Sequence, residues 1–257
     1  MKPIVSILIT NFNKEKYIKK CLQSCINQSF KNFEICVADN NSSDKSLKII
    51  NKFKKKIRIF KIKRKFNTGP QNQLFCIKEM IKKSRGKVVC LLDSDDFFYK
   101  NKLKIIVDTL KRKNKKFFFD KPHLGNKNSF KIKNKKNKYI WPTIFPTSSI
   151  SFVKKEFTSF DKLSFLTNKE FSYLAIDFRI QVYSMLIIKD YEIIKNKITY
   201  YRQVKSGLES NWKKYSLAWW KRRYQAHIYL RKLFKIKNKR INKNFDFLIS
   251  KLLSNFS

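Results

Sequence analysis

Three aspartates, Asp93, Asp95 and Asp96, lie within four positions in the stretch "CLLDSDDFF" (residues 90–98). They directly follow a hydrophobic run, in a chain with 18 acidic residues, 60 Lys and Arg, and a net charge of +42. Because adjacent carboxylates repel one another, such a cluster persists where a cation binds it or where it caps a helix. Carboxylate oxygens are hard ligands that suit Mg²⁺ or Mn²⁺. The cluster is therefore a candidate metal site, with helix capping as the alternative.

The elements that must position these acids can be predicted from hydrophobic runs in the first 110 residues. Runs rich in β-branched residues predict strands at 4–10, 33–38, 57–62 and 87–92. Apolar residues at helical spacing lie between them. This alternation predicts an α/β fold with a mostly parallel central sheet flanked by helices.

A polar cluster follows each predicted strand or the turn after it. The clusters are "TNFN" (10–13), "DNNSSD" (39–44), "NTG" (67–69) and "DSDD" (93–96). Because parallel strands end at the same edge of a sheet, where ligands bind, we expect all four clusters to form one site.

The rest of the chain is less regular. Residues 111–138 are rich in Lys and Asn and predict an exposed insertion or hairpin. A Pro-punctuated loop then enters a short strand within 139–153, a helical stripe covers 171–188, and 197–203 predicts a strand. Residues 211–257 predict basic, aromatic helices.

The five cysteines are odd in number, contain no CxxC pair and have only two histidines as partners, which disfavours a zinc site. We expect reduced core thiols, as in a cytoplasmic protein. No apolar run reaches the ~20 residues that span a bilayer. The N-terminal stretch predicts a buried strand rather than a signal peptide.

The positive charge raises a nucleic-acid-binding protein as an alternative class. However, only 10 of the 60 basic residues are Arg, the residue that makes bidentate base contacts. We therefore interpret most Lys as solvated surface and disfavour nucleic acid as a partner. Weak attraction to an anionic membrane is still expected.

Residues 3–105 resemble the nucleotide-sugar-binding half of the family-2 glycosyltransferases, which have the GT-A fold. The resemblance rests on "VSILITNFNKEKY", "FEICVADNNSSDKS", "NTG" and "CLLDSDDFF", in the family's order and spacing. It implies that 1–110 is the nucleotide-sugar-binding half and 111–210 the acceptor-binding and catalytic half. Residues 211–257 would form C-terminal helices.

The resemblance also implies site residues. Thr10 and Phe12 would line a nucleoside pocket, Asp39 and Asn40 would face base and ribose, and Asp44 would close the same loop. The metal ligands would be Asp95, Asp93 and Asp96. The full set of implied donor-binding residues is Thr10, Phe12, Asp39, Asn40, Asp44, Asn67, Gly69, Asp93, Ser94, Asp95 and Arg202.

Two departures from the family pattern affect the nucleoside pocket. Asn40 replaces the second acid of the usual pair, and "PQNQLFC" (70–76) lacks the Arg that commonly follows the "NTG" turn. Arg64 or Lys65 is near enough in sequence to replace it.

An inverting transfer needs a carboxylate that takes the proton of the acceptor hydroxyl. By resemblance, Asp177 in "SYLAIDFRIQ" is the candidate base, and Glu170 and Asp161 are the fallbacks. The alternative is a helix-surface acid paired with Arg179 or Lys189.

The stretch "PTSSISF" (146–152) resembles a family segment that lies near the acceptor. Ser148 and Ser149 would bind sugar hydroxyls and Trp141 would stack on a ring, with an ordinary Pro-rich turn as the alternative. The Gln-x-x-Arg-Trp signature of processive synthases is absent from the sequence, which favours single additions.

The sequence thus predicts an inverting, metal-dependent glycosyltransferase that uses Mn²⁺ or Mg²⁺. Its donor would be a nucleotide-sugar, a UDP-sugar by expectation, and its acceptor a glycan or lipid-linked sugar, as in cell-surface polysaccharide biosynthesis. A non-catalytic relative is the remaining alternative. The C-terminal helices would either cover the open side of the sheet or lie peripherally on the inner membrane leaflet.

Overall fold

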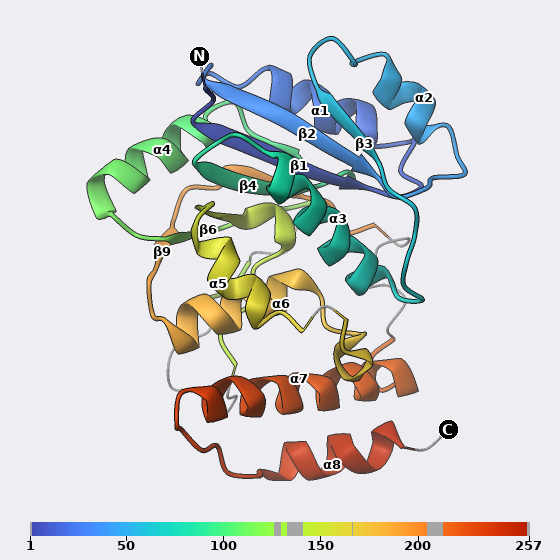
Figure 1. The fold of residues 1–257 in the computed structure, drawn as a ribbon, viewed down its shortest axis with the longest axis vertical. Coiled ribbons are helices and arrows are strands. Elements are labelled where there is room, and N and C mark those ends of the chain that lie inside the picture. The colour runs from blue at the N-terminus through green and yellow to red at the C-terminus, as the bar shows by residue number, and fades with distance from the viewer. Residues whose placement is uncertain (1, 126–129, 133–140, 166, 205–212, 256–257) are drawn as a thin grey trace.

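The computed structural model describes residues 2–125, 130–132, 141–165, 167–204 and 213–255. Its first half alternates strand and helix as predicted (Figure 1). The elements are β1 (Val5–Asn11), α1 (Ile18–Ile26), β2 (Phe33–Asp39), α2 (Ser46–Asn51), β3 (Arg58–Lys61), α3 (Gly69–Lys83), β4 (Val88–Asp93), β5 (Phe97–Phe98) and α4 (Lys102–Lys113).

The second half contains shorter elements. They are β6 (Phe117–Asp120), β7 (His123–Leu124), η1 (Thr147–Ser149), β8 (Ile150–Val153), α5 (Glu156–Lys162), η2 (Lys169–Phe171), α6 (Ile176–Gln181), the π-helical η3 (Val182–Ile187), β9 (Tyr191–Ile194), β10 (Thr199–Tyr201), α7 (Leu217–Ile236) and α8 (Phe245–Ser254).

The described strands form two sheets. The larger has seven strands in the order β3-β2-β1-β4-β8-β6-β9, and the smaller has three in the order β5-β10-β7. Strands β3, β2, β1 and β4 are parallel, whereas β8 is antiparallel to both of its neighbours. The mostly parallel central sheet predicted from the sequence is confirmed.

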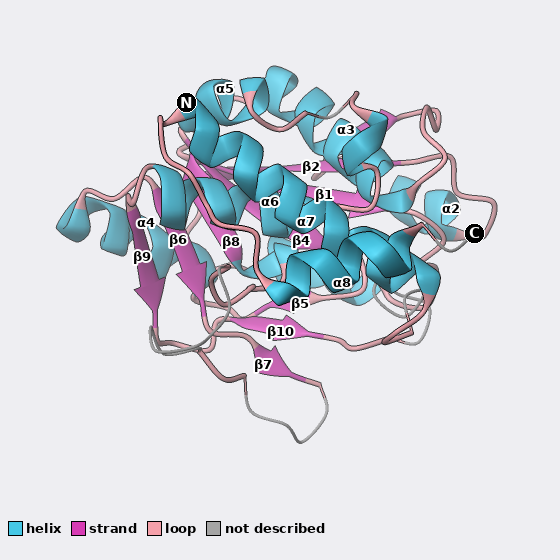
Figure 2. Cartoon of the chain, turned by 90° about the horizontal axis from the view of Figure 1, so that it is seen from below, coloured by secondary structure: helices cyan, strands magenta, loops and turns pink. Residues whose placement is uncertain are grey.

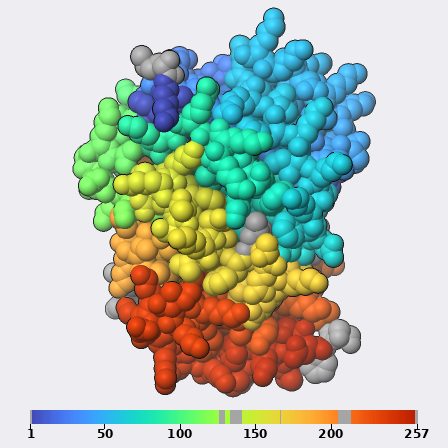
Figure 3. Space-filling view, in the orientation of Figure 1, coloured from blue at the N-terminus to red at the C-terminus, as the bar shows by residue number. Residues whose placement is uncertain are grey.

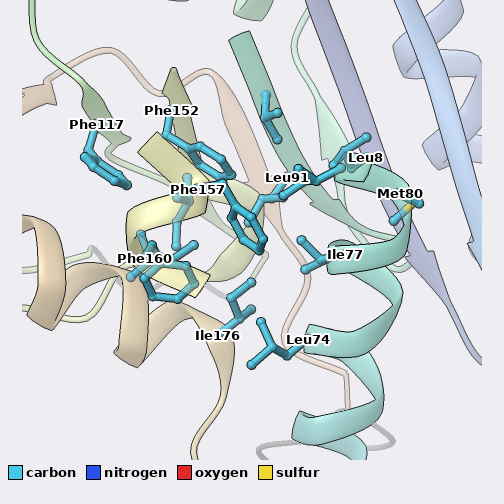
Figure 4. Packing of buried hydrophobic residues seen from close by; sticks show 14 of the residues in the cluster. Leu8, Leu74, Ile77, Met80, Leu91, Phe117, Phe152, Phe157, Phe160 and Ile176 are labelled. Atoms are coloured by element: carbon cyan, nitrogen blue, oxygen red, sulfur yellow. The ribbon is translucent and has the colours of Figure 1, made fainter. Parts of the chain in front are cut away.

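Both faces of the large sheet are covered, and this explains why its strands are continuously hydrophobic. Successive side chains point to opposite faces: Ile7 and Ile9 pack with α1, α2 and α4, whereas Leu8 packs with α3, α5 and α6. Figure 4 shows the second of these layers, where Leu74 and Ile77 of α3 meet Leu91 and the phenylalanines of α5. Figure 2 shows the helices lying across the strands.

One sequence prediction is wrong. Residues 117–120 were expected within an exposed insertion, but they form β6, a fully buried strand between β8 and β9. The run "FFF" is only three residues long and is flanked by lysines, so it carried too little periodic signal to be recognised. The cluster of Phe117, Phe118 and Phe119 supplies both layers of the core.

The C-terminal helices are present as predicted, but they do not cover the sheet. In the described residues, α7 packs against η2, α6 and η3 through a third cluster that contains no strand residue. Figures 1 and 3 show α7 and α8 forming the end of the molecule that lies farthest from the N-terminus. No described helix is long and apolar enough to cross a membrane.

Candidate functional site

The four polar clusters meet at the carboxyl edge of the sheet. Strand register places Thr10 beside Asp93 and Asn11 beside Asp39. The Thr10 hydroxyl donates to Asp93 Oδ1 at 3.2 Å, and Asn11 Nδ2 donates to Asp39 Oδ1 at 2.8 Å. Gln73, in the first turns of the helix that follows "NTG", donates to the same Asp93 oxygen at 2.7 Å. Hydrogen bonds therefore connect the ends of β1, β2 and β4 with α3.

Asp93 ends β4, is partly buried and has no ion-pair partner in the described part of the chain. Desolvation, followed by the charges of the nearby Asp95 and Asp177 carboxylates, raises its pKa to about 7, against the hydrogen bonds from Thr10 and Gln73. A carboxylate held in this way is electrostatically unsatisfied, because only neutral donors offset its charge. A cation beside it would relieve that cost.

Asp96 is buried, and it is braced from two sides. The Ser148 hydroxyl donates to Asp96 Oδ2 at 2.5 Å, and the Arg202 backbone N–H donates to Asp96 Oδ1 at 2.7 Å. Burial, followed by the charges of Asp95 and Asp93, holds the pKa of Asp96 well above its usual range. Asp96 therefore anchors the acidic turn from within the protein.

Asp95 is partly exposed, with 13% of its side chain accessible to solvent. Its carboxylate pairs with Lys14 Nζ at 2.8 Å, and its backbone carbonyl accepts from Arg202 Nε at 2.8 Å. Sequence reasoning missed Lys14. Its position directly after "TNFN" was the available signal, because any residue in that loop follows β1 out of the sheet edge.

The three acids suit a divalent cation in chemistry but do not enclose one. Among the described residues, no three His, Cys, Asp or Glu side chains gather closely enough to form a metal site by themselves. Magnesium typically takes one or two protein carboxylates and completes its shell with water and phosphate oxygens. The oxygen donors and the mutual repulsion of Asp93 and Asp95 fit such an arrangement, in which a ligand supplies the remaining oxygens.

The predicted nucleoside pocket contains an exposed aromatic ring. Phe12 is 42% exposed, and the Arg64 guanidinium lies over its ring at 4.2 Å. Arg64 also donates to Asn40 Oδ1 at 3.3 Å, whereas Lys65 lies over Phe75 instead. Of the two cations considered from the sequence, Arg64 is the one that reaches Phe12 and Asn40.

The loop after β2 is built around Asp39 and Asp44. Asp39 is buried and accepts from the Ser42 hydroxyl at 2.6 Å and the Ser42 backbone N–H at 3.1 Å. Asp44 accepts from the backbone N–H groups of Glu15 and Ser46, both at 2.9 Å. Although burial opposes it, these hydrogen bonds lower the pKa of Asp44. Asp44 therefore fixes the loops around the site.

The "NTG" turn opens α3. Thr68 precedes the helix and its hydroxyl donates to the Ser172 carbonyl at 2.7 Å, which joins this turn to the chain just before α6. Gly69 is the first helical residue, and Asn67 is exposed beside it. Ser94 is buried, and its backbone N–H donates to the Thr10 carbonyl at 3.2 Å.

Asp177 lies in the first turn of α6 and is 6% exposed. Its charge raises the pKa of Asp93, which places the two carboxylates in one electrostatic environment. Arg179 is directed elsewhere, to the backbone carbonyls of Leu174, Ser164 and Phe171. The alternative considered from the sequence was a helix-surface acid paired with Arg179 or Lys189, but Asp177 is buried. Its role as the base stays a prediction.

The two fallback acids are paired on the surface. Glu170 pairs with Lys232, and Asp161 pairs with Lys78 at 2.6 Å. Neither Glu170 nor Asp161 is among the main groups that shift the pKa of Asp93. Of the three candidate acids, Asp177 is thus the one whose charge raises the pKa of Asp93.

The predicted acceptor residues lie in two places. The Ser148 hydroxyl accepts from the Asp93 N–H at 3.0 Å as well as donating to Asp96, so its polar group is already engaged. Ser149 is fully buried beside it. Trp141 contacts the His227 ring at 4.8 Å and Phe178 at 6.4 Å, in the C-terminal cluster. An acceptor role for these three residues stays a prediction.

The fold and the acidic carboxyl edge define a GT-A glycosyltransferase. A family model for glycosyl transferase family 2 matches residues 6–175, and the chain belongs to that family. An uncharacterised glycosyltransferase of Haemophilus influenzae is 34% identical over 104 residues, which are 39% of this chain and 40% of that protein.

A second relative has a specific name. It is the UDP-Glc:alpha-D-GlcNAc-diphosphoundecaprenol beta-1,3-glucosyltransferase WfaP of Escherichia coli, which is 34% identical over 100 residues, 39% of this chain and 38% of that protein. The matches thus span less than half of either relative. The crystal structure of S. aureus TarS 1-349 in complex with UDP-GlcNAc has a TM-score of 0.65 and 16% identity, over 99% of this chain and 70% of that one.

Proposed function

We propose that this protein transfers a single sugar from a nucleotide-sugar, a UDP-sugar by preference, to a glycan or lipid-linked acceptor with inversion of the anomeric centre. The observation that carries the proposal is the network at the carboxyl edge, where Asp93 binds Thr10 and Gln73 and lies beside Asp95. The WfaP relative, by its name, uses UDP-Glc and a diphosphoundecaprenol-linked acceptor.

The nucleoside would lie against Phe12 and Arg64, with Asn40 facing the base. The exposed ring and the guanidinium above it provide stacking and positive charge in one place. Asn40 has an amide in place of the family's second acid, so its contact with the base would differ from that of its relatives. Asp39, held by Asn11 and Ser42, would position this loop.

The diphosphate would lie at Asp95, next to Lys14 and Arg202. Asp95, with Asp93, would hold Mn²⁺ or Mg²⁺ against the diphosphate oxygens. When bound, the ion would neutralise charge that develops on the leaving group. Lys14 and Arg202 place two further positive charges around Asp95, and Ser94 and Asp96 would keep the turn in shape.

Asp177 would act as the base. The acceptor hydroxyl oxygen bonds to the anomeric carbon while the bond from that carbon to the diphosphate oxygen breaks, and the electron pair leaves with the nucleoside diphosphate. The hydroxyl proton passes to the Asp177 carboxylate. Because Asp177 belongs to α6, residues 111–210 would supply the catalytic half and 1–110 the donor half.

The test is a thermal-shift screen of nucleoside diphosphates with and without Mn²⁺. Because ligand at a hundredfold excess over Kd adds about 2.7 kcal/mol, UDP with Mn²⁺ should raise Tm by several degrees. The Asp95→Ala variant should lose this shift. No shift with any nucleotide, or salt-dependent duplex DNA binding that Asp95→Ala leaves intact, would contradict the proposal. UDP binding without donor turnover would identify a non-catalytic relative.

A further inference from the structure

Helix α8 (Phe245–Ser254) exposes three of its six apolar side chains to solvent. The residues buried against the rest of the structure are Phe247, Ser250 and Ser254. Three large apolar residues of the same helix are more than half exposed: Phe245 (77%), Leu248 (53%) and Leu252 (61%). These three, spaced three and seven residues apart, lie along one helical face, which we call the outer face of α8.

An exposed apolar stripe of this kind is unusual on a surface helix, because apolar stripes normally face the core. The Ser250 hydroxyl is buried and has no hydrogen-bond partner among the described residues. A hydrogen bond from Ser250 therefore does not explain why this face of α8 points inward. Leu248, Lys251, Leu252 and Asn255 line an open hollow on the outer face. A continuous apolar stripe on a monomer's surface commonly marks an interaction site.

Helix α8 is nevertheless held in place. Asp246 pairs with Arg223 Nε at 2.6 Å and with His227 Nε2 at 2.8 Å, both on α7. Phe247 packs edge-on against the His227 ring at 5.7 Å. These contacts fix which face of α8 points outward. Among the described residues, Figures 1 and 2 show no helix or strand beyond α8 on its side away from α7.

Exposed cations surround the outer face. The end of α7, the connection and α8 contain Lys235, Lys237, Lys239, Arg240, Lys243 and Lys251, all exposed. The one acid in 235–255 is Asp246, which is committed to Arg223 and His227. Ile236, 52% exposed, adds to the apolar area beside these cations.

We propose that the outer face of α8 docks on a bilayer that contains anionic lipids. Phe245, Leu248 and Leu252 would enter the boundary between headgroups and acyl chains, while the surrounding Lys and Arg contact lipid phosphates. A second copy of this chain fits the face less well. A two-fold pairing would bring each copy's six cations toward those of the other, in a protein of net charge +42. The inference does not depend on the proposed transfer reaction.

The test is flotation of the full chain with vesicles of phosphatidylcholine alone or mixed with phosphatidylglycerol. We expect binding to the mixed vesicles only, weaker at high salt. Replacing both leucines (Leu248→Ser with Leu252→Ser) should lower the vesicle partition coefficient about tenfold or more, because two leucine side chains are no longer transferred from water into the bilayer. Both side chains are exposed, so the variant should keep the native Tm.

Ile132→Ser is the control, since Ile132 is an exposed apolar residue (39%) outside α8. It should bind vesicles as the native chain does. Equal binding by the double leucine variant would show that lysines elsewhere hold the protein to lipid and would overturn the proposal. So would a dimer in light scattering that the leucine changes dissociate, if the native chain fails to bind the vesicles.

Discussion

Two carboxylates at opposite edges of the same sheet behave in opposite ways. Glu34, near the start of β2, accepts from the Ser6 hydroxyl at 2.7 Å and pairs with Arg58 at 2.8 Å and Arg85 at 3.2 Å. Although burial opposes it, hydrogen bonds from Arg85, Ser6 and Arg58 lower the pKa of Glu34 to about 2. Asp93, at the end of β4, has its pKa raised to about 7 by burial and neighbouring acids.

The difference separates a carboxylate that cations compensate from one that they do not, and we interpret the second as functional. With 60 basic residues available, the chain neutralises Glu34 twice but leaves Asp93 among Asp95, Asp96 and Asp177. An arrangement of like charges costs stability, and such costs concentrate at functional sites. Glu34 at the amino edge is therefore compensated by two cations, whereas Asp93 at the carboxyl edge lies among like charges with no ion-pair partner in the described residues.

The largest effect is expected from the carboxyl edge. Asp177→Asn should lower sugar transfer by about 10²- to 10⁴-fold, because the acceptor hydroxyl would lose its proton acceptor. UDP binding should remain. Transfer assays with Glu170→Gln as the control should leave activity near native, since Glu170 is an exposed acid paired with Lys232. Retention of more than a few per cent of transfer by Asp177→Asn would refute its role as base.

A third carboxylate, Asp120, tests the structural side of the comparison. It forms an ion pair with Lys102, and both side chains are fully buried. The Lys102 ammonium also donates to the Thr199 hydroxyl at 3.0 Å. Asp120→Asn should cost about 3–5 kcal/mol in urea denaturation, since it leaves an uncompensated buried ammonium.

Replacing both partners of that pair, as Lys102→Met with Asp120→Leu, should cost less than Asp120→Asn alone. If the double variant is the less stable of the two, the attraction within the ion pair exceeds its desolvation cost. That result would contradict the view that Lys102 only compensates the buried charge of Asp120.

Glu34 makes stability depend on pH in a defined window. Its folded pKa of about 2 lies below the reference value of 4.5, so its contribution is fully present above pH 4.5 and is lost as pH falls toward 2. That contribution is on the order of 2–3 kcal/mol. Glu34→Gln should remove it, together with the part of the acid dependence that it causes.

The matched control is Glu79→Gln, because Glu79 forms an exposed pair with Lys82 at 2.6 Å. It should change the free energy of unfolding by at most about 0.5 kcal/mol. Parallel pH profiles for native and Glu34→Gln chains, measured by denaturation, would show that Glu34 is not the structural carboxylate described here.

The smallest effect has the opposite sign. Asp93→Asn, measured with a chelator present, should leave stability unchanged or raise it by on the order of 1 kcal/mol, because it removes one of several like charges. Transfer activity should be lost. A clear fall in Tm would mean that the ionised Asp93 stabilises the fold, and the comparison with Glu34 would no longer hold.

The sequence was sufficient to predict the carboxyl edge because local signals coincide there. Each strand ends in a polar cluster, and the register of a parallel sheet brings those clusters together without further information. Glu34 could not be interpreted in the same way. Its partners Ser6, Arg58 and Arg85 come from three other segments, and nothing in their local sequence marks the pairing.

The second half was harder to predict for similar reasons. The Ser148 hydroxyl hydrogen-bonds to the Asp93 N–H and to the Asp96 carboxylate, which are more than fifty residues away in the sequence. These contacts depend on the tertiary fold and cannot be predicted from the local sequence. Helix α8 shows a further limit. Hydrophobic periodicity predicts that a helix has an apolar face but not whether that face is buried. In α8, Phe247 faces inward together with Ser250 and Ser254, whereas Phe245, Leu248 and Leu252 are exposed.

The central claim is that the carboxyl edge of the sheet, and not its amino edge, is a metal-assisted nucleotide-sugar site. Isothermal titration of UDP in the presence of Mn²⁺ tests this directly on the native chain, Asp95→Asn and Glu34→Gln. The account predicts Mn²⁺-dependent binding that Asp95→Asn abolishes and Glu34→Gln preserves. Binding that survives in Asp95→Asn, or that is lost in a folded Glu34→Gln chain, would contradict it.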